Sequence, residues 1–203
     1  MSMLRMVRGL SAAAAVAATV AGGAAGAQPY QGTGAFSSAQ EVPPPPVVVS
    51  TGTGTVSALL SASGLSLTVD LSYRDMLAPV AGAHIHTGGP GVNGPVAIDF
   101  GGANGFVFGM TSGSYSRVFD LTLAQSYGGA YLTSFGGNVA AARADFVSNF
   151  VASNAYANLH SAVRPAGEIR ANLAVTAVPE PSTYVLMATG LGALGLVARR
   201  RRA

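Results

Sequence analysis

Cysteine and lysine are both absent from the 203 residues of this chain. Without cysteine, the chain cannot form a disulfide scaffold, a Cys-ligated zinc site, an iron–sulfur centre or a thiol nucleophile. Export to an oxidising compartment remains open, because exported proteins do not require disulfides. Charged residues are also scarce, at 9%, whereas apolar residues make up 49%, so the composition argues against a long disordered region.

The net charge of +3 comes from the two ends of the chain. Arg5 and Arg8 lie near the N-terminus, and consecutive arginines at 199–202 lie at the other end. Residues 28–178 between them hold five arginines against seven acidic residues, so the body of the protein is mildly acidic. Nucleic-acid binding needs a basic surface, and we therefore expect no nucleic-acid partner.

Residues 1–27 have the three parts of a secretory signal peptide. The two N-terminal arginines form a positive region, an apolar run follows at 10–20, and Ala25 and Ala27 place small side chains at the cleavage positions. The run is shorter than the ~20 residues that a membrane-spanning helix needs. We therefore predict export by the secretion machinery and cleavage by signal peptidase before Gln28.

The C-terminal segment, residues 178–203, combines a short motif, an apolar run and a basic cluster. The motif is Pro179-Glu180-Pro181, the run extends from Tyr184 to Val197, and the cluster is Arg199, Arg200, Arg201 and Arg202. At about 1.5 Å per residue, a helical run of this length spans roughly 21 Å, less than the ~30 Å hydrocarbon core. Arginines placed after such a run hold that end on the cytoplasmic side of the membrane.

This three-part arrangement resembles the PEP-CTERM sorting signal of Gram-negative bacteria. The resemblance implies an inner-membrane intermediate held by a short transmembrane helix, recognition by an exosortase-like membrane protease, and removal of the tail. It further implies delivery to the cell surface, the outer membrane or the extracellular matrix. In a cell without an exosortase, the tail would instead remain as an anchor.

Residues 28–177 form one predicted all-β domain. Apolar and polar residues alternate over 65–73, with the period of two that is typical of a half-buried strand. Further extended segments are expected at 47–60, 80–86, 96–100, 115–123, 156–160 and 168–175. Apolar residues at helical spacing, with Asn138 as N-cap, predict a helix over 138–152. We expect an antiparallel Ig-like or Greek-key sandwich of about seven or eight strands with this one helix inserted, flanked by the N-terminal signal helix and the C-terminal apolar helix.

An ordered set of motifs in this domain resembles the CHRD domain, which occurs in chordin and in many bacterial secreted proteins. The motifs are Ala39–Pro44, Ala83–His86, Gly91–Val96, Tyr156–His160 and Arg164–Leu173. The resemblance covers about 32–175, and the stretch 101–153 departs from it by being longer, which suggests that the predicted helix belongs to an insertion. It implies a secreted β-sandwich with no established enzymatic activity.

The three histidines of the chain, His84, His86 and His160, all lie in these motifs. His84 and His86 project from one face of a strand, and the three imidazoles converge if the two histidine-bearing strands are neighbours. Three imidazoles can ligate Cu or Zn and leave one position open, and binding should then weaken as the pH falls through ~6.5. The alternative is structural, with the imidazoles joining strand ends by hydrogen bonds. Asp75 and Asp99 could add a ligand or cap turns, and of the two roles we favour the turns.

Glu168, Arg170 and Asn158 form a second candidate group, which we expect to be a structural polar cluster. Glu168 and Arg170 share one face of their strand without being forced into contact. No Gly-x-Ser-x-Gly elbow or phosphate-binding loop with its lysine is present, so no catalytic residue is predicted.

The leading interpretation is therefore an exported, non-enzymatic protein of the cell surface or extracellular matrix, with a structural or binding role alongside exopolysaccharide. The alternative is a Cu- or Zn-binding periplasmic or surface protein, or a metalloenzyme, that uses the three histidines.

Overall fold

The computed structural model describes residues 28–43, 49–179 and 181–201 of the chain. Gln28, the residue expected to follow signal cleavage, is the first of these. The signal peptide with Ala25 and Ala27 lies outside the described residues, as do Glu180 and Arg202 of the sorting motif.

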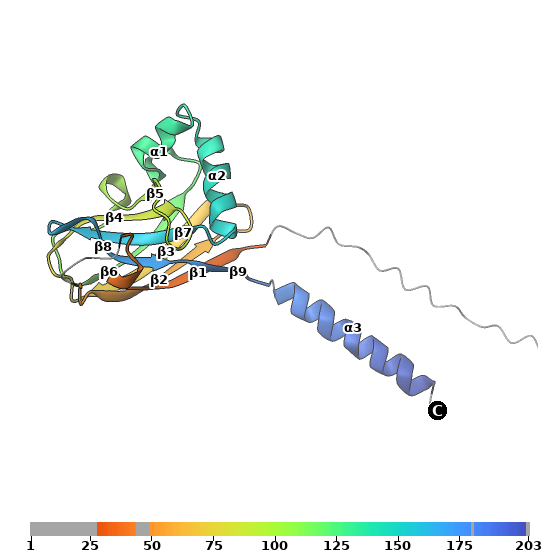
Figure 1. The fold of residues 1–203 in the computed structure, drawn as a ribbon. Coiled ribbons are helices and arrows are strands. Elements are labelled where there is room, and N and C mark those ends of the chain that lie inside the picture. The colour runs from red at the N-terminus through yellow and green to blue at the C-terminus, as the bar shows by residue number, and fades with distance from the viewer. Residues whose placement is uncertain (1–27, 44–48, 180, 202–203) are drawn as a thin grey trace, which may run out of the picture.

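Two antiparallel β-sheets pack face to face and make the body of the protein (Figure 1). The five-stranded sheet has the order β6-β3-β2-β1-β9, and the four-stranded sheet has the order β5-β4-β7-β8. The first contains β1 (Tyr30–Phe36), β2 (Thr53–Leu60), β3 (Ser66–Arg74), β6 (Gly113–Asp120) and β9 (Ala174–Ala177). The second contains β4 (Val80–Thr87), β5 (Val96–Asp99), β7 (Ala155–Ser161) and β8 (Arg164–Asn172). The predicted all-β antiparallel sandwich is confirmed.

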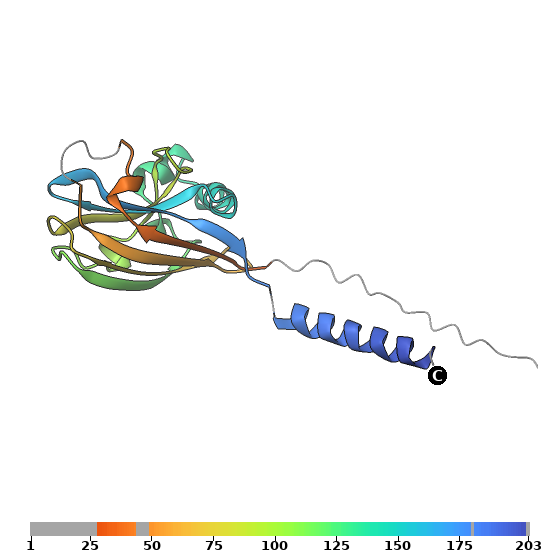
Figure 2. The same ribbon diagram turned by 60° about the horizontal axis from the view of Figure 1, so that its bottom comes forward.

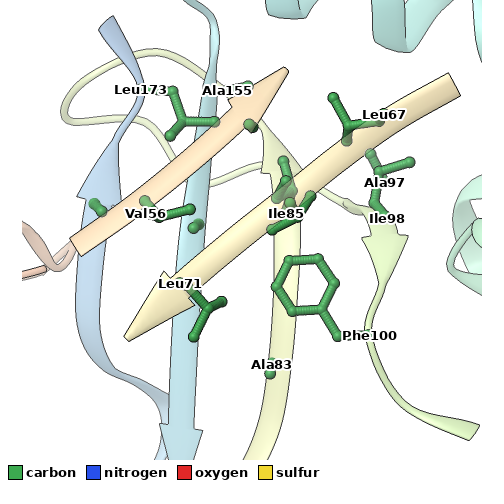
Figure 3. Packing of buried hydrophobic residues seen from close by; sticks show 14 of the residues in the cluster. Val56, Leu67, Leu71, Ala83, Ile85, Ala97, Ile98, Phe100, Ala155 and Leu173 are labelled. Atoms are coloured by element: carbon green, nitrogen blue, oxygen red, sulfur yellow. The ribbon is translucent and has the colours of Figure 1, made fainter. Parts of the chain in front are cut away.

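The core lies between the sheets and follows from the alternation along each strand. Figure 3 shows Val56, Leu67 and Leu71 of β2 and β3 facing side chains of the other sheet. Among their counterparts, Ile85 is fully buried and so is Phe100, which follows β5. Burying one such side chain stabilises the fold by about 1.5–3 kcal/mol relative to exposing it.

The described residues contain nine strands, more than expected, for two separate reasons. The segment predicted as one final strand is two, because the chain leaves β8 at Asn172 and joins the opposite sheet as β9. The second reason is β1, which lies where only a lead-in was expected. Its inward positions Gly32 and Gly34 carry no apolar side chain that could signal a strand, yet they allow close packing. A Cβ on Gly34 would lie 2.8 Å from the backbone oxygen of Asn172.

The predicted helix over 138–152 is present as α2 (Val139–Val151). Asn138 caps its N-terminus, since the side-chain oxygen accepts a hydrogen bond from the Ala141 N–H at 3.1 Å. Ala142, Phe146 and Phe150 form a stripe at i, i+4 and i+8, and all three are buried. A shorter helix that was not predicted, α1 (Gly129–Ser134), lies beside α2 at one end of the sandwich (Figure 1).

The C-terminal apolar run is part of a single helix, α3 (Pro181–Arg200), which follows β9 and extends away from the sandwich (Figure 2). Arg199 and Arg200 lie in its last turn, where positive charge interacts favourably with the helix dipole. Among the described residues, no helix combines the length and the apolar character needed to cross a membrane.

The outer face of the four-stranded sheet is covered by loops, and this cover creates the polar interior described below. The 3₁₀ turn η1 (Ser38–Gln40) packs on β8, with Ser37 bridged to Arg170. The loop after β4 is held to the segment after η1, because the Asn93 side chain donates to the Val42 carbonyl at 2.6 Å. Polar side chains on this outer face are therefore buried, although they point away from the apolar core.

Replacing Asn138 with alanine removes the N-cap of α2 and should lower the free energy of unfolding by about 1 kcal/mol. Asn138→Asp, which keeps the accepting oxygen, should unfold close to wild type. Chemical denaturation of the three proteins measures this, and equal stability of Asn138→Ala and wild type would contradict the assigned cap.

Candidate metal centre

The histidines converge because β4 and β7 are neighbours in one register. Gly82 pairs with His160, His84 with Asn158, and His86 with Tyr156. The ring of His84 is centred 5.6 Å from that of His86 and 5.1 Å from that of His160. One ring nitrogen from each histidine lies within 4.8 Å of the other two. The structure thus brings together all three residues that the sequence indicated as ligands.

Backbone carbonyls fix the orientation of two of these rings. Nδ1 of His86 lies 2.9 Å from the Gly94 oxygen, and Nδ1 of His160 lies 3.0 Å from the Pro165 oxygen. A carbonyl oxygen can only accept, so in both rings Nδ1 carries the hydrogen and Nε2 holds the free lone pair. The same arrangement orients metal-bound histidines in proteins.

The third ring has a carboxylate nearby, beyond hydrogen-bond distance. Nε2 of His84 lies 3.8 Å from Oδ1 of Asp99, across the β4–β5 pair. Oδ1 of Asp99 also accepts the Gly101 N–H at 2.8 Å, so Asp99 caps a turn, the role that we favoured from the sequence. With Nε2 directed to this carboxylate, Nδ1 of His84 is the nitrogen left for a ligand.

Each of the three imidazole rings has one remaining nitrogen without a hydrogen-bond partner among the described residues. Nδ1 of His84, Nε2 of His86 and Nε2 of His160 are buried and have no hydrogen-bond partner within the described parts of the chain. An unsatisfied buried polar atom costs about 1–3 kcal/mol, and folded proteins carry few of them. Three such lone pairs in one cluster are the donor set that a transition metal requires.

Burial keeps these imidazoles neutral. Desolvation and, to a smaller extent, the neighbouring His160 together lower the pKa of His84 to about 4, against an opposing effect of Asp99. Desolvation also lowers the pKa of His86 to about 4 and shifts that of His160 downward. The folded protein therefore binds fewer protons than the unfolded chain as the pH falls from 6.5 towards 4, and it loses stability over this range. Metal binding should persist below the expected ~6.5, because protons compete for the ligands only at lower pH.

A stack of three side chains holds the His86 ring. The Tyr156 ring lies parallel to that of His86, at 4.7 Å between centroids, and the Arg170 guanidinium carbon lies 3.4 Å from the Tyr156 ring centre on β7. Arg170 is fully buried, which requires that its donors be satisfied. They bond to Asn172 Oδ1 (2.9 Å), Asn93 Oδ1 (3.3 Å), Gly89 O (2.8 Å) and Val92 O (3.0 Å). Arg170 thereby fixes both the loop after β4 and the tyrosine that packs on His86.

Asn158 joins this stack to a buried carboxyl group that the sequence did not indicate. Its amide nitrogen donates to Oε2 of Glu41 at 3.2 Å, and Glu41 is only 6% exposed. Desolvation raises the pKa of Glu41 to about 7, against the lowering effects of Asn158 and Arg170. Gly167, at φ 134°, leaves room for the Glu41 carboxyl group, since a Cβ at Gly167 would lie 2.5 Å from Oε2 of Glu41.

Glu168 belongs to a separate network, so the predicted polar cluster is divided in two. Oε1 of Glu168 accepts from the Ser50 hydroxyl and from the Leu77 N–H, both at 2.6 Å, and Oε2 accepts from Ser161. These bonds join β8 to the segment before β2 and to the loop after β3. Asn158 and Arg170, by contrast, are direct neighbours across the β7–β8 pair.

Comparison with known families agrees with both resemblances. Residues 33–173 match the family model of the CHRD domain, and residues 177–202 match that of the PEP-CTERM protein-sorting motif. The matched ranges agree closely with the limits expected from the motifs. No curated protein and no solved structure matches the chain.

Replacing Glu41 with glutamine should change stability in a pH-dependent way. The folded-state pKa is raised, so the wild-type protein is most favoured while Glu41 is protonated and loses stability as the pH rises through 7. Glu41→Gln stays neutral and should be more stable than wild type at pH 8, by up to about 3 kcal/mol, with little difference at pH 4.5. Denaturant unfolding at both pH values measures this. A difference that is constant across pH would contradict the raised pKa.

Proposed function

The chain belongs to the CHRD-domain family, and from this premise we propose that its exported β-sandwich binds one copper or zinc ion through His84, His86 and His160. The PEP-CTERM motif indicates export to the cell surface or extracellular matrix, with processing by an exosortase-type membrane protease. We assign the metal site to residues 28–177 and treat residues 178–203 as the segment that this protease removes. Signal peptidase would remove residues 1–27.

The observation that carries the proposal is the cluster of three buried imidazole nitrogens that have no hydrogen-bond partner among residues 28–43, 49–179 and 181–201. Zinc in proteins binds imidazole nitrogen at ~2.0–2.1 Å, and copper accepts the same donors. Ring nitrogens within 4.8 Å of one another need only small side-chain rotations to reach a common ion. Two backbone carbonyls supply the outer contacts that orient His86 and His160 as such ligands.

The proposed ion would have a binding and structural role. It would join β4 to β7 and would satisfy polar atoms that otherwise destabilise the sandwich. The chain's own residues supply the neutral ligands and orient two of them through backbone carbonyls. The described residues around the ion include no partnered nucleophile and base, so the proposal assigns no reaction to it.

If the proposal holds, the purified protein should retain close to one copper or zinc ion per chain after passage over a chelating resin. Saturating metal should also raise the melting temperature, because binding to the folded state alone adds about 2.7 kcal/mol at a free concentration 100 times the Kd. Elemental analysis and calorimetry measure both effects.

The His84→Ala/His86→Ala protein should lose the ion and the stabilisation, since only one imidazole remains. Thr55→Val, on the opposite sheet, is the matched control and should behave as wild type. Absence of stoichiometric metal from the wild type, or equal stabilisation of the double variant, would overturn the proposal.

The outer face of the five-stranded sheet supports a second candidate function, contact with a polysaccharide of the cell surface or matrix. An open groove of about 670 Å³ runs over this face, and its polar lining is Thr33, Thr55, Ser57, Asp70 and Ser72. The register places Thr33, Ser57 and Asp70 in one row across β1, β2 and β3. Rows of hydroxyl groups suit a hydroxyl-rich polymer, and the sorting motif sends the protein to where such polymers lie.

Co-sedimentation with the host's surface polysaccharide tests this second function. Thr55→Val/Ser57→Ala should lower the bound fraction several-fold, whereas Ser148→Ala on α2 should leave it unchanged. The His84→Ala/His86→Ala protein should bind polysaccharide normally, which separates the two functions. Equal binding by all of these proteins would exclude the groove as the contact surface.

A further inference from the structure

A cavity of about 330 Å³ lies beside the histidine cluster. Its lining consists of Ala81, Gly82, His84, His160, Ser161, Ala162 and Pro165. Apart from the two imidazoles, these side chains are small or end close to the backbone. A water molecule takes about 30 Å³ of liquid volume, so the cavity has room for several solvent molecules or a small ion. His86, 7% exposed, does not line this cavity.

Gly82 keeps this cavity open above the imidazoles. It lies on β4 two residues before His84, on the same face of the strand, and pairs directly with His160. A Cβ at this position would lie 3.2 Å from Cε1 of His84 and 3.5 Å from Cβ and Cδ2 of His160. The backbone of Gly82 is not in the left-handed region, so its conformation does not require glycine. Because Gly82 has no side chain, it leaves space beside the rings of His84 and His160.

Three protein ligands leave a metal ion with one unfilled position, as in catalytic zinc sites. We propose that this position faces the cavity lined by Gly82, His84 and His160 and holds an exchangeable water or small monodentate anion. This inference rests on the proposed metal site. Imidazole binds a metal in its neutral form, so three such ligands would leave a divalent ion with its full charge. Asp99, the carboxylate near His84, does not line the cavity. An anion entering the cavity would therefore be attracted to the uncompensated charge.

The test uses the full chain loaded with Cu(II) and the azide ion as probe. Titration with azide should change the Cu(II) absorption spectrum in a saturable way. Water-proton relaxation should be enhanced by the bound Cu(II), and azide should reduce that enhancement as it displaces the water. Both measurements report directly on the open position.

Gly82→Val should weaken azide binding at least tenfold, because its side chain fills the space over His84 and His160. Azide binding is compared per bound copper, since a Cβ at this position would lie 3.2 Å from Cε1 of His84. Gly82→Ala adds the Cβ alone and should give an intermediate effect, which keeps the test decisive if the valine variant does not fold. Ala35→Val, at an exposed position on β1, is the control for adding bulk to a strand and should bind azide as wild type does.

The outcomes separate this inference from the proposed function. A wild-type protein that binds no copper overturns the metal site itself. Stoichiometric copper without any azide response, and without enhanced water relaxation, means that the fourth position is closed, which overturns only the present inference. Unchanged azide binding in both Gly82 variants would likewise exclude the cavity as the access route.

Discussion

The antiparallel pairing of β4 with β7 is the constraint on which the candidate site depends. It places His84 opposite Asn158, and His160 opposite Gly82. Because side chains alternate along a strand, a slip of one residue would turn the imidazoles of one strand into the apolar core. Ala83 and Ile85 on β4, with Leu159 on β7, are fully buried between the sheets and hold the register against such a slip. The apolar core thereby determines the position of polar groups on the opposite face.

The polar residues on that opposite face form a candidate site, rather than an ordinary exposed surface, because loops cover part of the face. The loops over the four-stranded sheet bury His86 and leave His84 and His160 half-buried, and the resulting desolvation lowers the pKa of His84 and His86 to about 4. The cover depends on Arg170, which bonds to the loop after β4 and stacks on the tyrosine beside His86. A fully buried guanidinium is costly unless all its donors are used, so Arg170 strongly favours one arrangement of that loop. The same desolvation that keeps the imidazoles neutral leaves their free nitrogens with an energetic cost that a bound cation would relieve.

The sequence was sufficient where the signal is local and periodic. The alternation over 65–73 predicts β3, helical spacing and a cap predict α2, and the two-residue step from His84 to His86 predicts a shared face. It was insufficient where the signal is an absence or a long-range contact. β1 has glycine at inward positions, so it shows no apolar period. The space that Gly82 leaves beside His160 becomes apparent only once the neighbouring strand is placed. Glu41 lies 117 positions from Asn158 along the chain, so no local pattern could indicate their contact. Its place in the Ala39–Pro44 motif was the one available signal.

X-ray absorption spectroscopy of the zinc-loaded protein can decide whether the three histidines hold the ion, because it counts the ligands around it. For the three-histidine site, the spectrum should show three imidazole nitrogens at ~2.0–2.1 Å together with one further light ligand. In the His84→Ala/His86→Ala protein, the imidazole contribution should fall to one at most. A coordination shell made only of oxygen, or one with fewer than two imidazoles in the wild-type protein, would contradict the three-histidine site.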